Sequence, residues 1–135
     1  MEIDDEYINI FPNNTILIVE DNEINIEVLH FLLHKTGISI DYAHDGKEAL
    51  DMFGANPEKY DLVLMDIYMP NIDGFTATRK LRSMGDKGRD IPVIALTANA
   101  SQKDMEMCFA AGMNEHVKKP INLKELITKM RQFLS

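Results

Sequence analysis

The run Leu62-Val63-Leu64-Met65-Asp66 decides the fold, because four apolar residues lead without a break into a carboxylate. An unbroken apolar run of this length is typical of a strand covered on both faces, as strands in parallel sheets are. Similar runs lie at residues 16–19 and 93–96, and residues 38–43 and 115–118 are also predicted as strands. The sequence therefore predicts a buried sheet of five strands.

Segments with helical periodicity separate the predicted strands. Apolar residues recur at helical spacing over residues 24–33, and Gly37 is a natural C-terminal stop. The later helix starts are predicted at side chains that can cap a helix N-terminus: Asp45, Asp73, Ser101 and Asn122. Ser101 and Asp104 also have the spacing of a capping box, whereas residues 85–90 are expected to form a polar loop.

Five β/α units in succession predict parallel strand pairing with right-handed crossovers, and hence an α/β sandwich. A chain of 135 residues is expected to form one domain. We assign this domain to residues 15–135. Residues 1–14, an acidic segment that ends in Pro12-Asn13-Asn14, are interpreted as a linker or as a short arm packed on the domain.

The charge balance argues against direct binding of nucleic acid. The net charge is −8, and the Lys and Arg residues are scattered among acids, whereas DNA recognition begins with basic residues that neutralise phosphates. No apolar run approaches the roughly 18–20 residues of a membrane span, so no membrane contact is expected. The acidic N-terminus is unlike a signal peptide, and the single Cys108 cannot form an internal disulfide. A cytoplasmic location is therefore expected, either alone or as the cytosolic part of a larger chain.

Polar side chains leave the predicted strands at their carboxyl ends, where the functional crevice of an open α/β sheet lies. Strand one is followed by Glu20 and Asp21, strand three by Asp66, strand four by Thr97 and strand five by Lys119. Three crowded carboxylates need a cation or raised pKa values at neutral pH. Because all the ligands would be hard oxygens, Mg²⁺ or Mn²⁺ is expected rather than zinc.

This set of side chains also predicts phosphoryl chemistry. Asp66 would be the nucleophile that forms an acyl phosphate, and Lys119 and Thr97 would contact phosphoryl oxygens. Each residue has a structural alternative: Asp21 or Asn22 could cap the first helix, and Asp66 could lie in a turn. Thr97 could be a strand-end hydroxyl, and Lys119 could be a solvated surface charge. The convergence of all of them at successive strand ends favours the functional interpretation.

Several segments together resemble the receiver domain of two-component signalling, from near Thr15 to the end of the chain. The matching segments are Val19-Glu20-Asp21-Asn22, Leu64-Met65-Asp66, Met69-Pro70, Asp73-Gly74, residues 92–98, Ala111-Gly112-Met113 and Lys118-Lys119-Pro120. The resemblance implies a flavodoxin-like, doubly wound (βα)5 three-layer sandwich. Its parallel five-stranded sheet would have the order 2-1-3-4-5.

The resemblance also implies roles for individual residues. In that family the acidic pair, here Glu20 and Asp21, organises Mg²⁺, for which Mn²⁺ can substitute. The phosphoacceptor falls on Asp66, and the backbone carbonyl of Tyr68 completes the protein ligands of the metal. Such a domain catalyses only its own phosphorylation and dephosphorylation, so no enzyme acting on external substrates is expected.

Further implied roles concern the phosphate contacts and the switch. Thr97 and Lys119 fall on the phosphate-contacting positions, and the Lys119–Pro120 peptide is commonly cis in the family. On phosphorylation the Thr moves inward and an aromatic ring three residues before the Lys follows it. Here that switch position holds His116, which is polar and titratable.

Finer details are similar to receivers attached to hybrid sensor histidine kinases, notably Asp21-Asn22-Glu23-Ile24-Asn25 and residues 96–100. The implied partners are a sensor histidine kinase core and a histidine phosphotransfer protein. We interpret the chain as a piece of a hybrid kinase, with a stand-alone response regulator as the alternative. Whether the domain forms a weak homodimer is left open by the sequence.

Other classes of function fit the sequence less well. A flavodoxin-type FMN binder needs a phosphate-cradling loop after strand one, where Glu20 and Asp21 would repel the phosphate. A phosphatase with an aspartate nucleophile usually has a second Asp two residues later, where Tyr68 stands. A phosphorylation-independent pseudo-receiver is a third alternative, against which the intact set of site residues argues.

Overall fold

The protein, described here from a computed structural model, is built around one parallel sheet of five strands in the order β2-β1-β3-β4-β5. The structure describes residues 5–99 and 101–134. The strands are Thr15–Val19 (β1), Ser39–Ala43 (β2), Leu62–Asp66 (β3), Val93–Thr97 (β4) and Glu115–Lys118 (β5). The predicted strand order and parallel pairing are confirmed.

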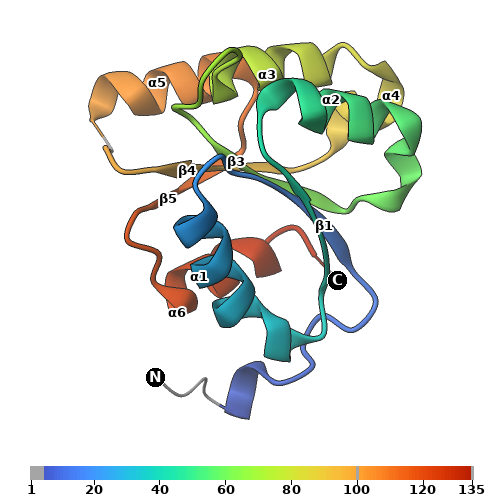
Figure 1. The fold of residues 1–135 in the computed structure, drawn as a ribbon, viewed down its shortest axis with the longest axis vertical. Helices are drawn as coiled ribbons and strands as arrows, with labels where there is room; N and C mark the ends of the chain where they lie inside the picture. Colours follow the sequence, from blue (N-terminus) through green and yellow to red (C-terminus); the bar gives the residue numbers. More distant parts are fainter. Residues whose placement is uncertain (1–4, 100, 135) are drawn as a thin grey trace.

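Helices cover both faces of the sheet, as the doubly wound fold requires (Figure 1). The helices α1 (Glu23–Leu33) and α6 (Leu123–Arg131) lie on one face. The opposite face carries α2 (Gly46–Ala55), α3 (Gly74–Arg82), α4 (Gly85–Asp90) and α5 (Gln102–Ala111). Short 3-10 helices lie at Asp5–Tyr7, His34–Thr36 and Pro57–Lys59.

Alternate residues of the buried strands supply the two apolar cores. In β1, Leu17 and Val19 pack with the core on the side of α2, α3 and α5, whereas Ile16 and Ile18 pack with the core on the side of α1 and α6. Successive side chains of a strand point to opposite faces, so a strand covered twice must be apolar throughout. This is why the deciding runs of the sequence show no polar alternation.

The helix starts are fixed by the predicted capping side chains. Asp45, Asp73, Ser101 and Asn122 each accept a hydrogen bond from the amide three residues ahead. Asn22 caps α1 in the same way, through the amides of Ile24 and Asn25. These bonds satisfy amides that have no partner inside the first turn of a helix.

The prediction of a polar loop over residues 85–90 is wrong, because these residues form the short helix α4. Their sequence, Gly-Asp-Lys-Gly-Arg-Asp, has no apolar periodicity from which a helix could be predicted. The turn depends instead on close packing, since a Cβ at Gly88 would overlap the carbonyl oxygen of Leu81. Contacts with α3 thus override the local sequence preference.

The described part of the N-terminal segment packs on the domain. Tyr7 and Phe11 are buried in the core beside α1, and the amides of Asn9 and Phe11 donate to the carbonyls of Lys35 and Thr36, each at 2.8 Å. These contacts favour the packed arm over the linker for residues 5–14, while the domain boundary at residue 15 remains a prediction. Among the described residues, no helix is long and apolar enough to cross a membrane.

Arg82, at the end of α3, links this helix to the segment around α4 and to the segment before β5. Its guanidinium donates to the carbonyl of Gly112 at 2.7 and 2.9 Å, to that of Gly88 at 2.9 Å and to that of Ile91 at 2.6 Å. It also donates to the Asn114 side chain at 2.9 Å. The planar fork of Arg can serve several acceptors at once, which a Lys ammonium cannot do in the same geometry.

We expect Arg82→Met to lower the free energy of unfolding by about 2–4 kcal/mol, because it leaves several carbonyl oxygens without donors. Urea unfolding followed by circular dichroism would measure this loss. The matched control is Arg79→Met in the same helix, since Arg79 is exposed and its guanidinium donates to the Thr76 hydroxyl within its own helix. An equal effect of the two substitutions would contradict the structural role of Arg82.

Candidate functional site

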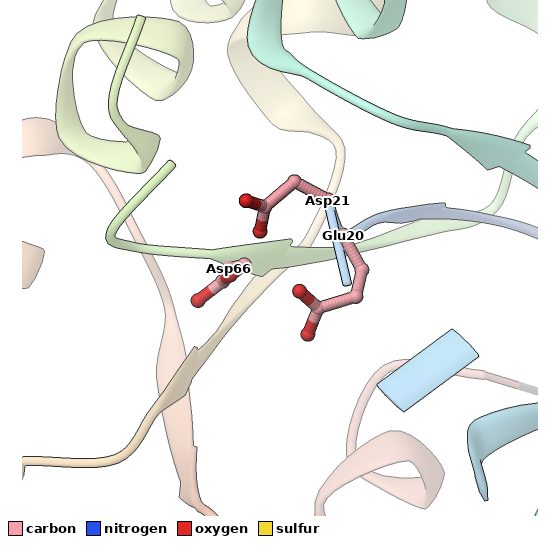
Figure 2. Close-up of side chains that lie close together, drawn as sticks. All are labelled: Glu20, Asp21 and Asp66. Carbon is pink, nitrogen blue, oxygen red and sulfur yellow. The ribbon is translucent and has the colours of Figure 1, made fainter. Parts of the chain in front are cut away.

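Three carboxylates meet at the carboxyl edge of the sheet (Figure 2). Glu20 and Asp21 follow β1, and Asp66 ends β3. One carboxylate oxygen from each residue lies within 4.8 Å of those from the other two. Glu20 and Asp66 are buried, whereas Asp21 is exposed. The structure thus brings together the three acids that the sequence placed at these strand ends.

Strand register explains why these acids are neighbours. Val19 pairs with Met65 in the parallel ladder of β1 and β3. Glu20 and Asp66 directly follow these two paired residues, so they lie side by side at the edge of the sheet. Because both strands run in the same direction, their carboxyl ends, and the acids found there, lie at the same edge of the sheet.

A close backbone approach fixes the end of β3. The amide of Gly74 donates to the carbonyl of Ile67 at 2.6 Å. A Cβ at Gly74 would overlap the carbonyl oxygen of Asp66 and lie 2.8 Å from Cα of Ile67. Asp73 then starts α3 by accepting from the amide of Thr76 at 2.8 Å. Glycine is therefore required where the chain returns to the strand that carries Asp66.

The Lys119 side chain completes the cluster from the end of β5. Its Nζ lies 2.7 Å from Oε1 of Glu20 and 3.3 Å from Oδ1 of Asp66. The Lys119 amide donates to the carbonyl of Thr97 at 2.7 Å, and the Lys119–Pro120 peptide bond is cis. One ammonium group thus faces two buried carboxylates.

The pKa values of the two buried acids are shifted in opposite directions. Burial raises the pKa of Asp66 to about 7, with a further contribution from Glu20, while Lys119 acts in the opposite direction. Burial also acts to raise the pKa of Glu20, but the hydrogen bonds from Lys119, Asp66 and the Asn22 amide, together with the charge of Lys119, outweigh it, and this pKa is lowered. Burial acts to lower the pKa of Lys119, yet its two acidic partners raise it. Glu20 is therefore charged at neutral pH, and Asp66 is close to its midpoint.

The donor set fits a hard divalent cation. Three carboxylates whose oxygens lie within 4.8 Å of one another, with no Cys or His in the cluster, suit Mg²⁺ or Mn²⁺. A single ammonium does not neutralise three carboxylates, so charge balance also favours a cation here. Protonation of Asp66 is the alternative by which the metal-free site can reduce its repulsion.

The remaining predicted residues lie around this cluster with other partners. The Thr97 hydroxyl donates to the carbonyl of Asn99 at 2.6 Å and accepts from its amide at 3.1 Å. Nδ1 of His116 lies 3.6 Å from Oε1 of Glu115, and the His116 side chain is partly exposed. Within the described part of the chain, the Thr97 hydroxyl and the His116 ring thus have polar partners other than the three acids.

Tyr68 has a side-chain partner that the sequence did not indicate. Its ring is mostly exposed, yet its hydroxyl donates to Oδ1 of the buried Asp104 in α5 at 2.8 Å. The two residues are 36 positions apart, and Asp104 was expected to take part in a capping box with Ser101. No local sequence pattern signals this pairing.

Comparison with known proteins identifies one family. The sequence model of the family described as "Response regulator receiver domain" matches residues 16–131. "Two-component system protein A" of Emericella nidulans is 40% identical over 93% of this chain and 18% of its own length. "Hybrid signal transduction histidine kinase B" of Dictyostelium discoideum is 37% identical over 85% of this chain and 6% of its own length. The chain therefore spans less than a fifth of either relative.

Solved structures agree with this result. The receiver domain of the sensor histidine kinase PA1611 from Pseudomonas aeruginosa, which has a magnesium ion coordinated in its active-site cleft, is 39% identical. It matches 89% of this chain and 96% of its own with a TM-score of 0.81. The complex of the Saccharomyces cerevisiae phosphotransfer protein Ypd1 with the receiver domain of Ssk1 gives 31% identity and a TM-score of 0.82, over 91% of this chain and 90% of the matched chain.

The raised pKa of Asp66 predicts how stability depends on pH without metal. The folded state holds this proton more tightly than the unfolded chain does. The proton's contribution to the free energy of unfolding is therefore fully present below about pH 4 and is lost as the pH rises through about 7. Between pH 4 and 8 we expect the free energy of unfolding of the metal-free protein to fall by on the order of 1–3 kcal/mol relative to that of Asp66→Asn. Urea unfolding in a chelator at several pH values would measure this difference. If the stability of the two proteins depended on pH in the same way, the pKa of Asp66 would not be raised in the folded state.

Proposed function

This chain belongs to the response regulator receiver domain family, and from that premise we propose that Asp66 is its phosphoacceptor. A receiver of this kind accepts a phosphoryl group in a two-component phosphorelay. The observation that carries the assignment is the position of Asp66: it ends β3 within the carboxylate cluster, with Oδ1 3.3 Å from the Lys119 ammonium. Of the two buried acids, it is the one whose pKa is raised.

In the proposed step, a carboxylate oxygen of Asp66 attacks the phosphorus of a phosphohistidine. A P–O bond forms, the P–N bond breaks, and its electron pair returns to the imidazole nitrogen of the donor. Asp66 must be deprotonated to attack, and Lys119 favours that form because its ammonium lies beside the carboxylate. Loss of the proton is accessible near neutral pH, since the pKa of Asp66 is about 7.

Glu20, Asp21 and Asp66, with the backbone carbonyl of Tyr68, would hold Mg²⁺, for which Mn²⁺ can substitute. The bound cation would supply positive charge next to the phosphoryl oxygens. The exposed Asp21 is accessible to a hydrated ion, while the buried Glu20 is oriented by the hydrogen bond from Lys119. Mg²⁺ usually keeps several waters, so few protein ligands are needed.

Thr97 and Lys119 are proposed to contact the other phosphoryl oxygens. The Thr97 hydroxyl would have to turn away from the carbonyl of Asn99, to which it now donates. Its movement would open space towards which the ring of His116 could shift, and this motion is the proposed switch. The ring of His116 is partly exposed, and its Nδ1 lies 3.6 Å from Oε1 of Glu115.

The phosphodonor is proposed to be a histidine phosphotransfer protein or a sensor histidine kinase core. The crystallised complex of Ypd1 with a similar receiver supports the first partner, and the hybrid kinases among the relatives support the second. We propose that the chain is the receiver part of a hybrid kinase, with catalysis limited to its own phosphorylation and dephosphorylation. A cytosolic location is part of this proposal and rests on the buried, unpaired Cys108.

Acetyl phosphate with Mg²⁺ should add one phosphoryl group to the protein, as measured by intact mass or by a phosphate-affinity gel. Asp66→Asn should abolish this modification, because the amide is not a nucleophile at neutral pH, and chelation of the metal should do the same. The control is Asp51→Asn, which removes an exposed carboxylate of α2 that pairs with Lys47. Full modification of Asp66→Asn would refute the assignment.

Lys119→Ala should slow phosphorylation on the order of tenfold or more, because it removes the positive charge beside Asp66. Its neighbour provides the matched control, since Lys118 is exposed and Lys118→Ala should leave the rate unchanged. Both rates would be measured with acetyl phosphate after circular dichroism has shown that both variants are folded. A folded Lys119→Ala protein with the normal phosphorylation rate would show that Lys119 does not contribute to this reaction.

A further inference from the structure

The hydrogen bond between Tyr68 and Asp104 connects the loop after the phosphoacceptor strand to α5. Tyr68 lies two residues after Asp66, and its hydroxyl donates to Oδ1 of Asp104 at 2.8 Å. The Tyr68 ring also makes a T-shaped contact with the ring of Phe75 in α3, with 6.3 Å between ring centroids and an interplanar angle of 90°. An exposed aromatic side chain is thus held at two points.

Asp104 is positioned for a different bond from the one its sequence suggests. Its amide donates to the Ser101 side chain at 3.1 Å, which is one half of a capping box. The return bond is not made, because Oδ1 of Asp104 accepts from Tyr68 and Oδ2 has no hydrogen-bond partner among the described residues. The Asp104 side chain is buried, with only 6% of the residue exposed. A buried carboxylate with an unpaired oxygen calls for an explanation other than helix capping.

The geometry limits what the backbone at Tyr68 can do. The chain leaves β3 at Asp66 and is already back in contact with it at Gly74, whose amide bonds to the carbonyl of Ile67. Within this short loop, the ring of Tyr68 is attached to α3 by packing and to α5 by its hydroxyl. Because the hydroxyl and the ring of Tyr68 are both held, the Cα of Tyr68 is restrained in position, and with it the backbone carbonyl carbon bonded to this Cα.

We propose that Asp104 is a positioning residue for the divalent cation, acting through the hydroxyl of Tyr68 on the position of the Tyr68 backbone and of its carbonyl. This inference rests on the proposed function, in which that carbonyl is a metal ligand. The restraint works in both directions, because a contact that favours cation binding is itself favoured by the bound cation. Cation binding at the end of β3 therefore stabilises the attachment of α5, the helix that carries the exposed side chains of Met107 and Phe109.

The affinity for Mg²⁺, and for Mn²⁺ as a second probe, would be measured by calorimetry without any phosphodonor. Tyr68→Phe removes only the hydroxyl and should weaken binding by about tenfold, the size typical of partners that orient metal ligands. Asp104→Ala should have a similar effect, and the double variant should be no weaker than either single variant. Asp104→Asn, whose amide oxygen can still accept from Tyr68, should retain most of the affinity.

The chain offers a matched control for the loss of a Tyr–Asp hydrogen bond. The hydroxyl of Tyr60 donates to Oδ2 of Asp41 at 2.7 Å, and Tyr60 precedes β3 at the amino end of the strand. Tyr60→Phe makes the same chemical change far from the cluster and should keep cation affinity within about twofold of the original protein. Amide hydrogen exchange adds a second readout: Mg²⁺ should slow exchange in α5 of the original protein but not in Tyr68→Phe.

The outcomes separate this inference from the proposed function. If the original protein and Asp104→Ala bind Mg²⁺ equally, or if the two substitutions weaken binding additively, the positioning role is wrong while the metal site stands. If the original protein binds neither cation, both the metal site and this inference are wrong. Weakened binding in Tyr68→Phe and Asp104→Ala, with normal binding in Tyr60→Phe, would establish the connection.

Discussion

The structure depends on the pairing of one ammonium group with two buried carboxylates. Lys119 lies between Glu20 and Asp66, at 2.7 and 3.3 Å, where burial makes any uncompensated charge costly. Removing one partner of a buried ion pair typically costs about 3–5 kcal/mol, because the remaining charge is left in a poorly solvated position. Burial and, after it, the neighbouring Glu20 raise the pKa of Asp66 in spite of the ammonium. The negative charge that the ammonium leaves uncompensated favours a divalent cation.

The rest of the fold holds these charges at fixed positions. Parallel pairing brings Glu20 level with Asp66, and the return of the chain at Gly74 closes the end of β3. Arg82 performs a comparable task at the other end of α3, where its guanidinium satisfies the carbonyls of the segments around α4 and before β5. A charged cluster needs such rigid support, because small displacements of its ligands would weaken every electrostatic contact.

The sequence predicted those features that depend on local patterns or on topology. Strand order followed from the succession of β/α units, and the meeting of Glu20, Asp21 and Asp66 followed from the strand ends of a parallel sheet. The helix α4 was missed because its stability comes from contacts with α3 and not from its own composition. The bond between Tyr68 and Asp104 was missed for a related reason, since Asp104 has the local signature of a capping residue while its actual partner is far away in the chain. Side-chain direction, unlike strand order, is decided by such distant contacts.

In the structure, the two groups proposed to contact the phosphoryl oxygens, Thr97 and Lys119, already have polar partners within the protein. The Thr97 hydroxyl donates to a neutral carbonyl, that of Asn99, and the Lys119 ammonium is close to Glu20. A phosphoryl group on Asp66 would have to replace these partners, so the free energy available for switching is only the difference between old and new contacts. Hydrogen bonds to charged acceptors are about twice as strong as those between neutral groups, which leaves a gain on the order of 1–2 kcal/mol for Thr97. Such a gain changes a conformational equilibrium by roughly five- to thirtyfold. Phosphorylation of this domain should therefore shift populations that exist beforehand rather than create a new structure.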